Sequence, residues 1–255
     1  MNELLKMTAH QVKEGKFDKV ILAIGSCEAH GQHLAEGCDT IVSYELSKQV
    51  ADRVPGMLVL PPITVGYRGH YDTFPFTLTF DYETMIHVIY DIVESVLRNG
   101  INKIFLMNGH DGNIAPIEIA ARKIKEKYPD ARIASLPEWW VIAGKLVPEG
   151  TFAVWNGLGH AGEGETSIAY HLFPQWCEPD QATCVVPDHL PEHVDIKWDF
   201  AEITDTAQTG DATVATAAKG KLMNDCLVEA VVKDIEALEK TGWNYNTSHC
   251  ATKLK

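Results

Sequence analysis

Residues 103–128 read KIFLMNGHDGNIAPIEIAARKIKEKY and contain three local patterns. Residues 103–107 form a short apolar run of strand length, and residues 114–128 have the spacing of an amphipathic helix. Between them, residues 108–113 consist mainly of Asn, Gly and Asp, the commonest turn formers. The stretch therefore predicts a buried strand that turns tightly into a helix.

The same order of strand and helix repeats along the first half of the chain. The predicted strands are the short apolar runs at 20–24, 57–60, 103–107 and 131–136. The predicted helices, with apolar residues on one face, are at 40–54, 82–99 and 114–128. Strands that alternate with helices are typical of βαβ units, so we predict an α/β fold with a mainly parallel sheet flanked by helices.

The remaining segments are less regular. Residues 63–80 are rich in Gly, Thr and aromatic residues, which predicts a loop and an alternating strand. Residues 174–210 are irregular, and a helix is predicted from about 215 to 240, lying on the sheet or covering its edge. Because no repeat, low-complexity tract or linker divides the sequence, we expect a single domain over residues 1–255.

Composition and charge narrow the possible functions. The chain has 255 residues, 45% of them hydrophobic, and a formal net charge of −13. This is an ordinary globular composition, and its negative charge repels phosphate backbones and anionic membranes, so we expect no nucleic-acid and no membrane partner. A polar N-terminal segment, the lack of a long apolar run and six cysteines without a CxxC pair predict a cytoplasmic protein with reduced thiols.

Glu28 and His30 follow the predicted strand at 20–24. They are two residues apart, so in extended backbone both side chains project to the same side. Asp39 opens the next predicted helix, from which its carboxylate can reach the same point. Two carboxylates and an imidazole suit zinc, manganese or iron. Asp39 also has an ordinary alternative role, as the N-cap of a helix that starts at Thr40.

Two further stretches carry histidine and carboxylates. His110 lies between two glycines in the predicted strand-to-helix turn, which could present its ring at the mouth of the sheet, although ordinary turn chemistry is the alternative. The stretch HAGEGETS, residues 160–167, places His160, Glu163 and Glu165 before another apolar segment. Its alternative is a capping box or a solvated helix start.

All three clusters lie at predicted strand-to-helix junctions. Unrelated turns would not all carry histidine plus carboxylate, and the carboxyl ends of strands in an α/β sheet are where ligands bind. We therefore predict a metal site at this rim. The ligands suffice for two divalent ions bridged by one carboxylate.

These stretches resemble motifs of the creatininase family, which contains creatinine amidohydrolase and its relatives, and the resemblance runs through most of the chain. EAHG at 28–31 with Asp39 resembles the family's E-x-H-G…D motif, NGH at 108–110 its N-G-H turn, and HAGEGETS its H-A/G-G-x-x-E-T-S segment. GDATVATAAKG at 210–220 is similar to a helix start of the family. The resemblance implies a mainly parallel α/β protein, commonly hexameric, that hydrolyses amide C–N bonds with zinc, manganese or iron.

The resemblance also implies a set of metal ligands. By this resemblance, Glu28 and His110 hold one divalent ion. His30 holds a second ion, and Asp39 binds both.

The sequence departs from the family at two positions. Gly112 stands where creatininase has a glutamate, the remaining ligand of the second ion. We expect Glu165 to replace it, because it is a carboxylate in the third cluster, with Glu163 and Asp111 in reserve. Phe76 stands where the family usually has glycine in an F-P-G-T sequence, which affects the expected shape of the pocket.

We expect the protein to be a dinuclear metal-dependent amidohydrolase. Its substrate would be a small, non-peptide, creatinine-like cyclic or linear amide, attacked by a hydroxide that bridges the two ions. The predicted catalytic residues are His160 and Glu165. His160 would pass a proton to the leaving nitrogen, since its ordinary pKa near ~6.5 suits this transfer. A histidine that merely hydrogen-bonds the turn is the alternative.

Two other functions stay open. One is a formamide deformylase that acts on a pyrimidine nucleotide intermediate of flavin or deazaflavin cofactor synthesis. A phosphorylated substrate would favour several basic residues, and only Arg68 lies in a candidate site loop. The other is a non-catalytic, metal-dependent small-molecule binding protein, if Gly112 reflects the loss of the second ion. The resemblance and the abundant aromatic residues also predict a homo-oligomer such as a hexamer.

Overall fold

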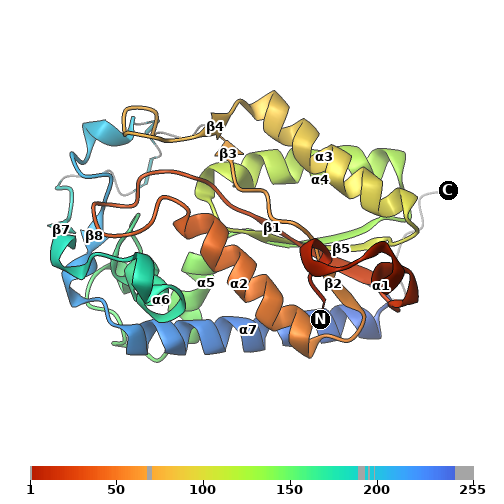
Figure 1. Ribbon diagram of the computed structural model, residues 1–255. Coiled ribbons are helices and arrows are strands. Elements are labelled where there is room, and N and C mark those ends of the chain that lie inside the picture. The colour runs from red at the N-terminus through yellow and green to blue at the C-terminus, as the bar shows by residue number, and fades with distance from the viewer. Residues whose placement is uncertain (1, 68–70, 189–192, 195, 198, 245–255) are drawn as a thin grey trace.

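A four-stranded parallel sheet lies between two layers of helices in the computed structural model of the chain (Figure 1). The structure describes residues 2–67, 71–188, 193–194, 196–197 and 199–244. In the order β2-β1-β5-β6, the strands are β2 (Met57–Val59), β1 (Lys19–Ile24), β5 (Lys103–Asn108) and β6 (Arg132–Leu136). The predicted α/β class and its parallel sheet are confirmed.

Helices cover both faces of this sheet. The α-helices are α1 (Ala9–Glu14), α2 (Cys38–Arg53), α3 (Tyr82–Arg98), α4 (Ile114–Lys127), α5 (Trp139–Leu146), α6 (Glu163–Leu172) and α7 (Ala217–Lys240). In Figure 1, α3 and α4 lie above the sheet, and α2, α5 and α7 lie below it. The predicted helices end within two residues of the observed ones, whereas α1 and α5 were not predicted. α7 lies across a face of the sheet, not along its edge.

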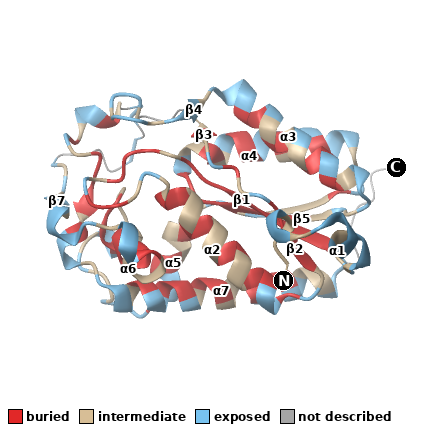
Figure 2. Ribbon diagram, viewed as in Figure 1, coloured by how far each residue is buried: buried red, intermediate tan, exposed pale blue. Residues whose placement is uncertain are grey.

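The core has two parts, one on each face of the sheet. All six residues of β1 are buried, as expected for a central parallel strand. Val20, Leu22 and Ile24 pack with residues of α3 and α4, whereas Ile21 packs with residues of α2 and α7. Figure 2 shows the buried strands and the inward faces of the helices around them. Full burial of each large apolar side chain contributes about 1.5–3 kcal/mol.

The connections contain very short elements. β3 (Gly66–Tyr67) pairs in parallel with β4 (Thr79–Phe80), and β7 (Cys184–Val185) pairs antiparallel with β8 (Gly210–Asp211). The 3₁₀ turns are η1 (Leu4–Lys6), η2 (Asp111–Asn113), η3 (Trp155–Gly157), η4 (Pro174–Trp176), η5 (Pro179–Gln181), η6 (Phe200–Glu202) and η7 (Ala212–Val214). The alternating strand predicted within 63–80 is therefore only two short pieces. Among the described residues, no helix has both the length and the apolar character needed to cross a bilayer.

Strand register brings the first two motifs together. Ile24, the last residue of β1, pairs with Asn108 at the end of β5, and the Gly109 N–H donates to the Ile24 carbonyl at 2.8 Å. A Cβ at position 109 would lie 2.3 Å from the Asp39 carbonyl oxygen, so only glycine allows β5 to end this close to α2. The three segments that carry Glu28, Asp39 and His110 therefore meet at one rim of the sheet.

The third motif reaches this rim by another route. The prediction that residues 160–167 follow a strand was wrong, because α5 and η3 lie between β6 and α6. These residues instead form the start of α6. Glu163, fully buried there, accepts hydrogen bonds from Lys219 Nζ on α7 and from the Ala153 N–H. This ion pair links two of the family-like segments.

Loss of this pair should destabilise the fold. Lys219→Ala leaves the buried Glu163 carboxylate without its cation, so we expect the free energy of unfolding to fall by about 2 kcal/mol. The matched control is Lys221→Ala on the same helix, whose partner Asp225 is exposed, with an expected loss below about 0.5 kcal/mol. Urea unfolding of both variants measures the difference; equal losses would contradict a structural role for the buried pair.

Candidate metal centre

Asp39 lies between two histidines. Its Oδ1 is 2.9 Å from His30 Nε2, and its Oδ2 is 3.1 Å from His110 Nδ1. The helix cap is Gly37, so the alternative role of Asp39 as an N-cap is wrong; the carboxylate belongs to the first turn of α2 and is almost fully buried. Each of its oxygens therefore faces a different group of side chains.

The first group consists of Glu28, Asp39 and His110. Glu28 Oε1 is 3.2 Å from His110 Nδ1, and the other Glu28 oxygen accepts a hydrogen bond of 2.7 Å from the Ser26 hydroxyl. All three side chains are buried, and their ligand atoms lie within 4.8 Å of one another. Ser26 thus fixes one oxygen of Glu28 and leaves the other facing Asp39 and His110.

The second group consists of His30, Asp39 and Glu165, whose ligand atoms also lie within 4.8 Å of one another. Glu165 Oε2 is 3.9 Å from His30 Nε2 and accepts a hydrogen bond of 2.7 Å from the Ala161 N–H. Ala161 has a φ of 47°, so this N–H is directed at Glu165 by a left-handed backbone turn. Glu165 reaches the group from the first turn of α6.

The tautomer of His30 fits a metal ligand. Its Nδ1 is 3.1 Å from the backbone carbonyl of Glu28, and a carbonyl only accepts, so Nδ1 carries a proton. When the ring is neutral, the lone pair of Nε2 faces Asp39 and Glu165. Metal-binding histidines usually have this second hydrogen bond, which orients the ring.

Charges in the two groups shift several pKa values. Burial alone would lower the pKa of His30, but the charge and hydrogen bond of Asp39 raise it to about 10. Burial alone would also lower the pKa of His110, but the charges of Glu28 and Asp39 raise that pKa well above its usual value. Burial raises the pKa of Glu165 to about 7, while the two histidines outweigh burial and lower that of Asp39. Without a metal, protons therefore balance the buried carboxylates.

Two buried carboxylate oxygens, Glu28 Oε1 and Asp39 Oδ2, face the same nitrogen. Among the described residues, neither accepts a well-aligned hydrogen bond, and His110 Nδ1 lies 3.2 and 3.1 Å away, where its proton can serve both only in part. Buried acceptors without partners are rare because each costs about 1–3 kcal/mol. Carboxylate oxygens and imidazole nitrogens suit zinc and manganese, so the donor set fits a divalent ion.

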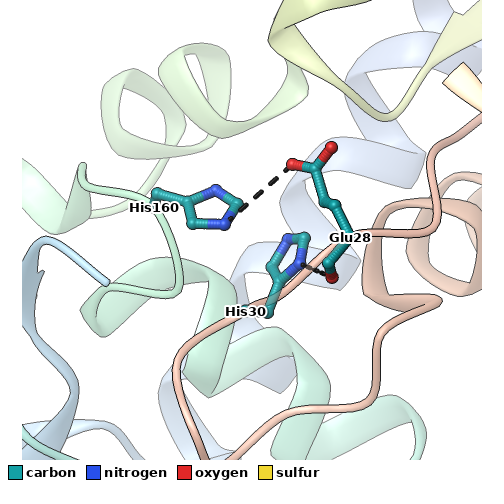
Figure 3. A group of neighbouring side chains, drawn as sticks. All are labelled: Glu28, His30 and His160. Carbon is teal, nitrogen blue, oxygen red and sulfur yellow. Dashed lines mark hydrogen bonds and ion pairs between the residues drawn. The ribbon is translucent and has the colours of Figure 1, made fainter. Parts of the chain in front are cut away.

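His160 lies beside both groups and forms a third group with Glu28 and His30, whose ligand atoms also lie within 4.8 Å of one another. Its Nε2 is 2.7 Å from the Ala29 carbonyl, so this nitrogen carries a proton, and it is 4.0 Å from Glu28 Oε1 (Figure 3). The His160 and His30 rings have centroids 4.2 Å apart. Burial and the charge of His30 lower the pKa of His160 well below its usual value. His160 is thus a neutral imidazole whose Nδ1 can accept a proton.

The structure distinguishes between the three carboxylates that we considered as replacements for the glutamate missing at position 112. Glu165 lies in the second group, Glu163 is paired with Lys219, and Asp111 is exposed on the pocket wall. A Cβ at position 112 would lie 2.7 Å from His110 Nε2, so the His110 ring occupies the space that a side chain there would need. Glu165 alone of these carboxylates approaches His30.

Sequence reasoning missed the side chains that hold the site loops. The Asn108 amide donates to the carbonyls of His110 and Pro137, and the Asn113 amide donates to the Gly25 carbonyl. His33 Nε2 is 2.8 Å from the Thr166 hydroxyl, which itself donates to the Ala161 carbonyl. The two asparagines stand in an obvious turn, but their long-range partners leave no signal in the sequence.

A pocket of about 420 Å³ opens over the two groups. Its described lining includes the polar residues Asp39, Tyr71, His110, Asp111, His160, Glu165 and Thr209 and the apolar residues Trp140, Val141, Leu158, Ile196, Phe200 and Ile203. Phe76 lies outside this lining, is 84% exposed and has a φ of 58°, a conformation that favours the glycine usual in the family. Arg68 lies outside the described residues.

A larger groove of about 640 Å³, between α1 and α3, has no histidine or cysteine among its described lining residues.

Comparison with known proteins agrees with this geometry. The creatininase family profile, described as creatinine amidohydrolase, matches residues 5–235. Creatinine amidohydrolase of Pseudomonas putida is 28% identical over 231 residues, covering 85% of this chain and 88% of that protein. The mycofactocin precursor peptide peptidase of Mycobacterium ulcerans (strain Agy99) is 25% identical over 242 residues, covering 89% and 90%.

Solved structures are similar over nearly the same length. A manganese creatininase superimposes with a TM-score of 0.77 at 26% identity, over 92% of this chain and 98% of that one. A creatininase variant of the Zn-Zn type has the same TM-score and identity, over 92% and 97%. Sequence and structure agree over most of the chain, which therefore belongs to the creatininase family.

Proposed function

We propose that this chain is a dinuclear, divalent-metal-dependent amidohydrolase that cleaves the C–N bond of a small amide. Membership of the creatininase family makes the chain a hydrolase that acts on amide bonds. The observation that carries the proposal of two ions is the position of Asp39, whose two oxygens face two separate groups of ligand atoms. A shared carboxylate is the usual bridge between paired ions.

The two groups define the proposed ligands. Glu28, Asp39 and His110 hold one ion, and His30, Asp39 and Glu165 hold the other. The unpartnered oxygens of Glu28 and Asp39 support this assignment, because an ion would satisfy both. Zinc or manganese is favoured by the donor types and by the similar creatininase structures that carry these metals in their descriptions.

The residues around the ions provide binding and proton transfer. When bound, the ions polarise the amide carbonyl and lower the pKa of a water molecule. The Nε2–H of His160 donates a hydrogen bond to the Ala29 carbonyl. Nδ1 is therefore the atom that accepts a proton and returns it to the leaving nitrogen. Its neutral state before the reaction, caused first by burial, suits the accepting step.

The pocket favours a compact substrate without a phosphate. Its described lining contains carboxylates and apolar side chains, and no lysine or arginine. A phosphorylated nucleotide would meet repulsion there, which argues against the deformylase alternative. The relative from Pseudomonas putida is a creatinine amidohydrolase and the mycobacterial relatives are peptide peptidases, so the tests include both kinds of amide. We keep the proposal of a homo-oligomer.

Metal-loaded protein should hydrolyse a small neutral amide. We expect turnover of at least one of creatinine, hydantoin, formanilide or a short peptide by protein loaded with Mn²⁺ or Zn²⁺, and no turnover after chelation. His160→Ala should lose at least 100-fold in kcat with its metal content unchanged. Release of amine or ammonia, together with metal analysis, measures both effects.

Three outcomes would contradict the proposal. Metal binding without turnover of any of these amides would favour a binding protein. Preference for a formamide on a pyrimidine nucleotide would favour the deformylase. Loss of metal from His160→Ala would make His160 a ligand.

Removal of the Glu165 carboxylate should weaken the binding of one ion only. Glu165→Gln has the same shape but lacks the charge, so we expect one ion to stay bound and the affinity for the second to fall by at least tenfold. Asp111→Asn is the matched control, since Asp111 lines the same pocket outside both groups, and it should keep two ions. Metal analysis after dialysis checks this. Two tightly bound ions in Glu165→Gln would exclude Glu165 as a ligand.

Metal affinity should rise with pH. In the metal-free protein the pKa of His30 is about 10, so at pH 7 to 9 this ring holds a proton that an ion must displace. Proton occupancy falls as pH rises, so the apparent affinity should increase about tenfold per pH unit for each displaced proton. Below pH 7 the Glu165 proton adds to the slope, because its pKa is about 7.

Calorimetric titration with Mn²⁺ at pH 6.5, 7.5 and 8.5, in two buffers of different ionisation enthalpy, measures affinity and proton release together. The control is His30→Ala, whose slope should be shallower by one proton. Equal affinities at pH 6.5 and 8.5 would contradict the assignment of His30 as a ligand.

A further inference from the structure

The pocket has few side chains that can donate a hydrogen bond to a substrate. Its carboxylates only accept, and the proposed roles of His110 and His160 commit both imidazoles. The described lining residues include no Lys, Arg, Asn, Gln or Ser. The remaining side-chain donors are the hydroxyls of Tyr71 and Thr209 and the indole N–H of Trp140.

Tyr71 is held firmly above the metal groups. Its ring lies between those of His160 and Phe200, with centroid distances of 4.5 and 4.6 Å, and is 6.2 Å from the His110 ring. Its backbone carbonyl accepts hydrogen bonds of 3.0 Å from the Thr77 hydroxyl and from the Phe74 N–H. The position of the phenol is therefore fixed by both its ring and its backbone.

The Tyr71 hydroxyl has no hydrogen-bond partner among the described residues, although it belongs to the pocket lining. Thr209 differs, because its hydroxyl oxygen accepts a hydrogen bond of 3.0 Å from the backbone N–H of His160 and so supports the backbone of that loop. The Trp140 ring packs edge-on against Trp139, 5.9 Å away, and makes no recorded ring contact with a site histidine. Of these three donors, Tyr71 is the one whose ring packs against the ring of His160, the proposed proton-transfer residue.

Amide hydrolysis needs a donor at the carbonyl oxygen. Water adds its oxygen to the carbonyl carbon, negative charge grows on the carbonyl oxygen, and the C–N bond then breaks with its electron pair and a proton going to nitrogen. A donor aimed at that oxygen in a site sheltered from water is typically worth about 10²–10³ in kcat. Burial, together with the nearby carboxylates, raises the pKa of Tyr71 well above its ordinary value, so the phenol keeps its proton at neutral pH.

We propose that Tyr71 is a further catalytic residue, whose hydroxyl donates a hydrogen bond to the carbonyl oxygen of the scissile amide as that oxygen gains negative charge. Tyr71 forms and breaks no covalent bond in this step, and the proton still passes through His160. The inference rests on the proposed function, since it requires an amide carbonyl beside the two metal groups.

Tyr71→Phe tests this inference by removing a single oxygen atom. For creatinine and formanilide hydrolysis by the Mn²⁺-loaded protein, we expect kcat to fall about 100-fold, with KM within about threefold and metal content unchanged. Tyr90→Phe is the matched control: it removes the hydroxyl of a tyrosine on α3 that donates to Glu94 and does not line the pocket, and it should keep wild-type kinetics. A wild-type kcat in Tyr71→Phe, or a loss of metal, would overturn the assignment.

A second measurement does not depend on turnover. Acetohydroxamate binds metal ions through an ionised oxygen that stands in for the charged carbonyl oxygen, so its affinity for the Mn²⁺-loaded protein should fall about tenfold in Tyr71→Phe and stay unchanged in Tyr90→Phe. If the wild type hydrolyses no tested amide, the proposed function fails while this measurement still decides the donor role. Equal affinities for wild type and Tyr71→Phe would overturn it.

Discussion

Three carboxylates buried side by side require compensating positive charge. Glu28, Asp39 and Glu165 are in this position at the rim of the sheet, and an uncompensated buried carboxylate costs several kcal/mol. Without metal, His30 and His110 meet the requirement by holding protons, which is why their pKa values are raised. In the proposed metal-loaded state, divalent charge would replace those protons, so the burial that raises the pKa of both histidines would also favour a bound cation.

The backbone imposes this crowding before any side chain is considered. Parallel pairing of Ile24 with Asn108 ends β1 and β5 at the same level, and Gly109 lets the β5 turn touch the first turn of α2. Asn113 ties that turn back to Gly25 at the end of β1. The loops that carry Glu28 and His110 therefore cannot separate without breaking the central strand pair of the sheet.

The local sequence pattern was enough to predict most of the fold, but it predicted only part of the site. Apolar runs and helical spacing marked the four strands and the long helices, because burial on both faces leaves a strong periodic signal. α5 was missed because it is only eight residues long and has no side-chain cap, and its absence from the prediction made residues 160–167 look like a strand-to-helix turn. Glu165 was chosen only because it is a carboxylate in the third cluster, a description that Glu163 also meets.

Side chains that act through distant partners could not be predicted in this way. The His33–Thr166 hydrogen bond joins residues 133 positions apart, and Tyr71 reaches His160 only because the loop before β4 folds over the start of α6. Neither residue stands in an unusual local sequence. Phe76 was noticed as a departure from the family, and its positive φ is a backbone conformation that favours glycine.

The change at Gly112 has a consequence for how the site moves. A glutamate on the β5 turn would tie the second ion to the sheet, where His110 is already fixed. Here the carboxylate proposed for that role is Glu165, on the same segment as His160, and Ala161 lies between them with its N–H bonded to Glu165 and its backbone in a left-handed turn. Displacement of this segment would move the proposed second-ion ligand and the proposed proton-transfer residue together. The buried Glu163–Lys219 pair, which anchors α6 to α7, would then affect the proposed ligand and the proposed proton-transfer residue at once.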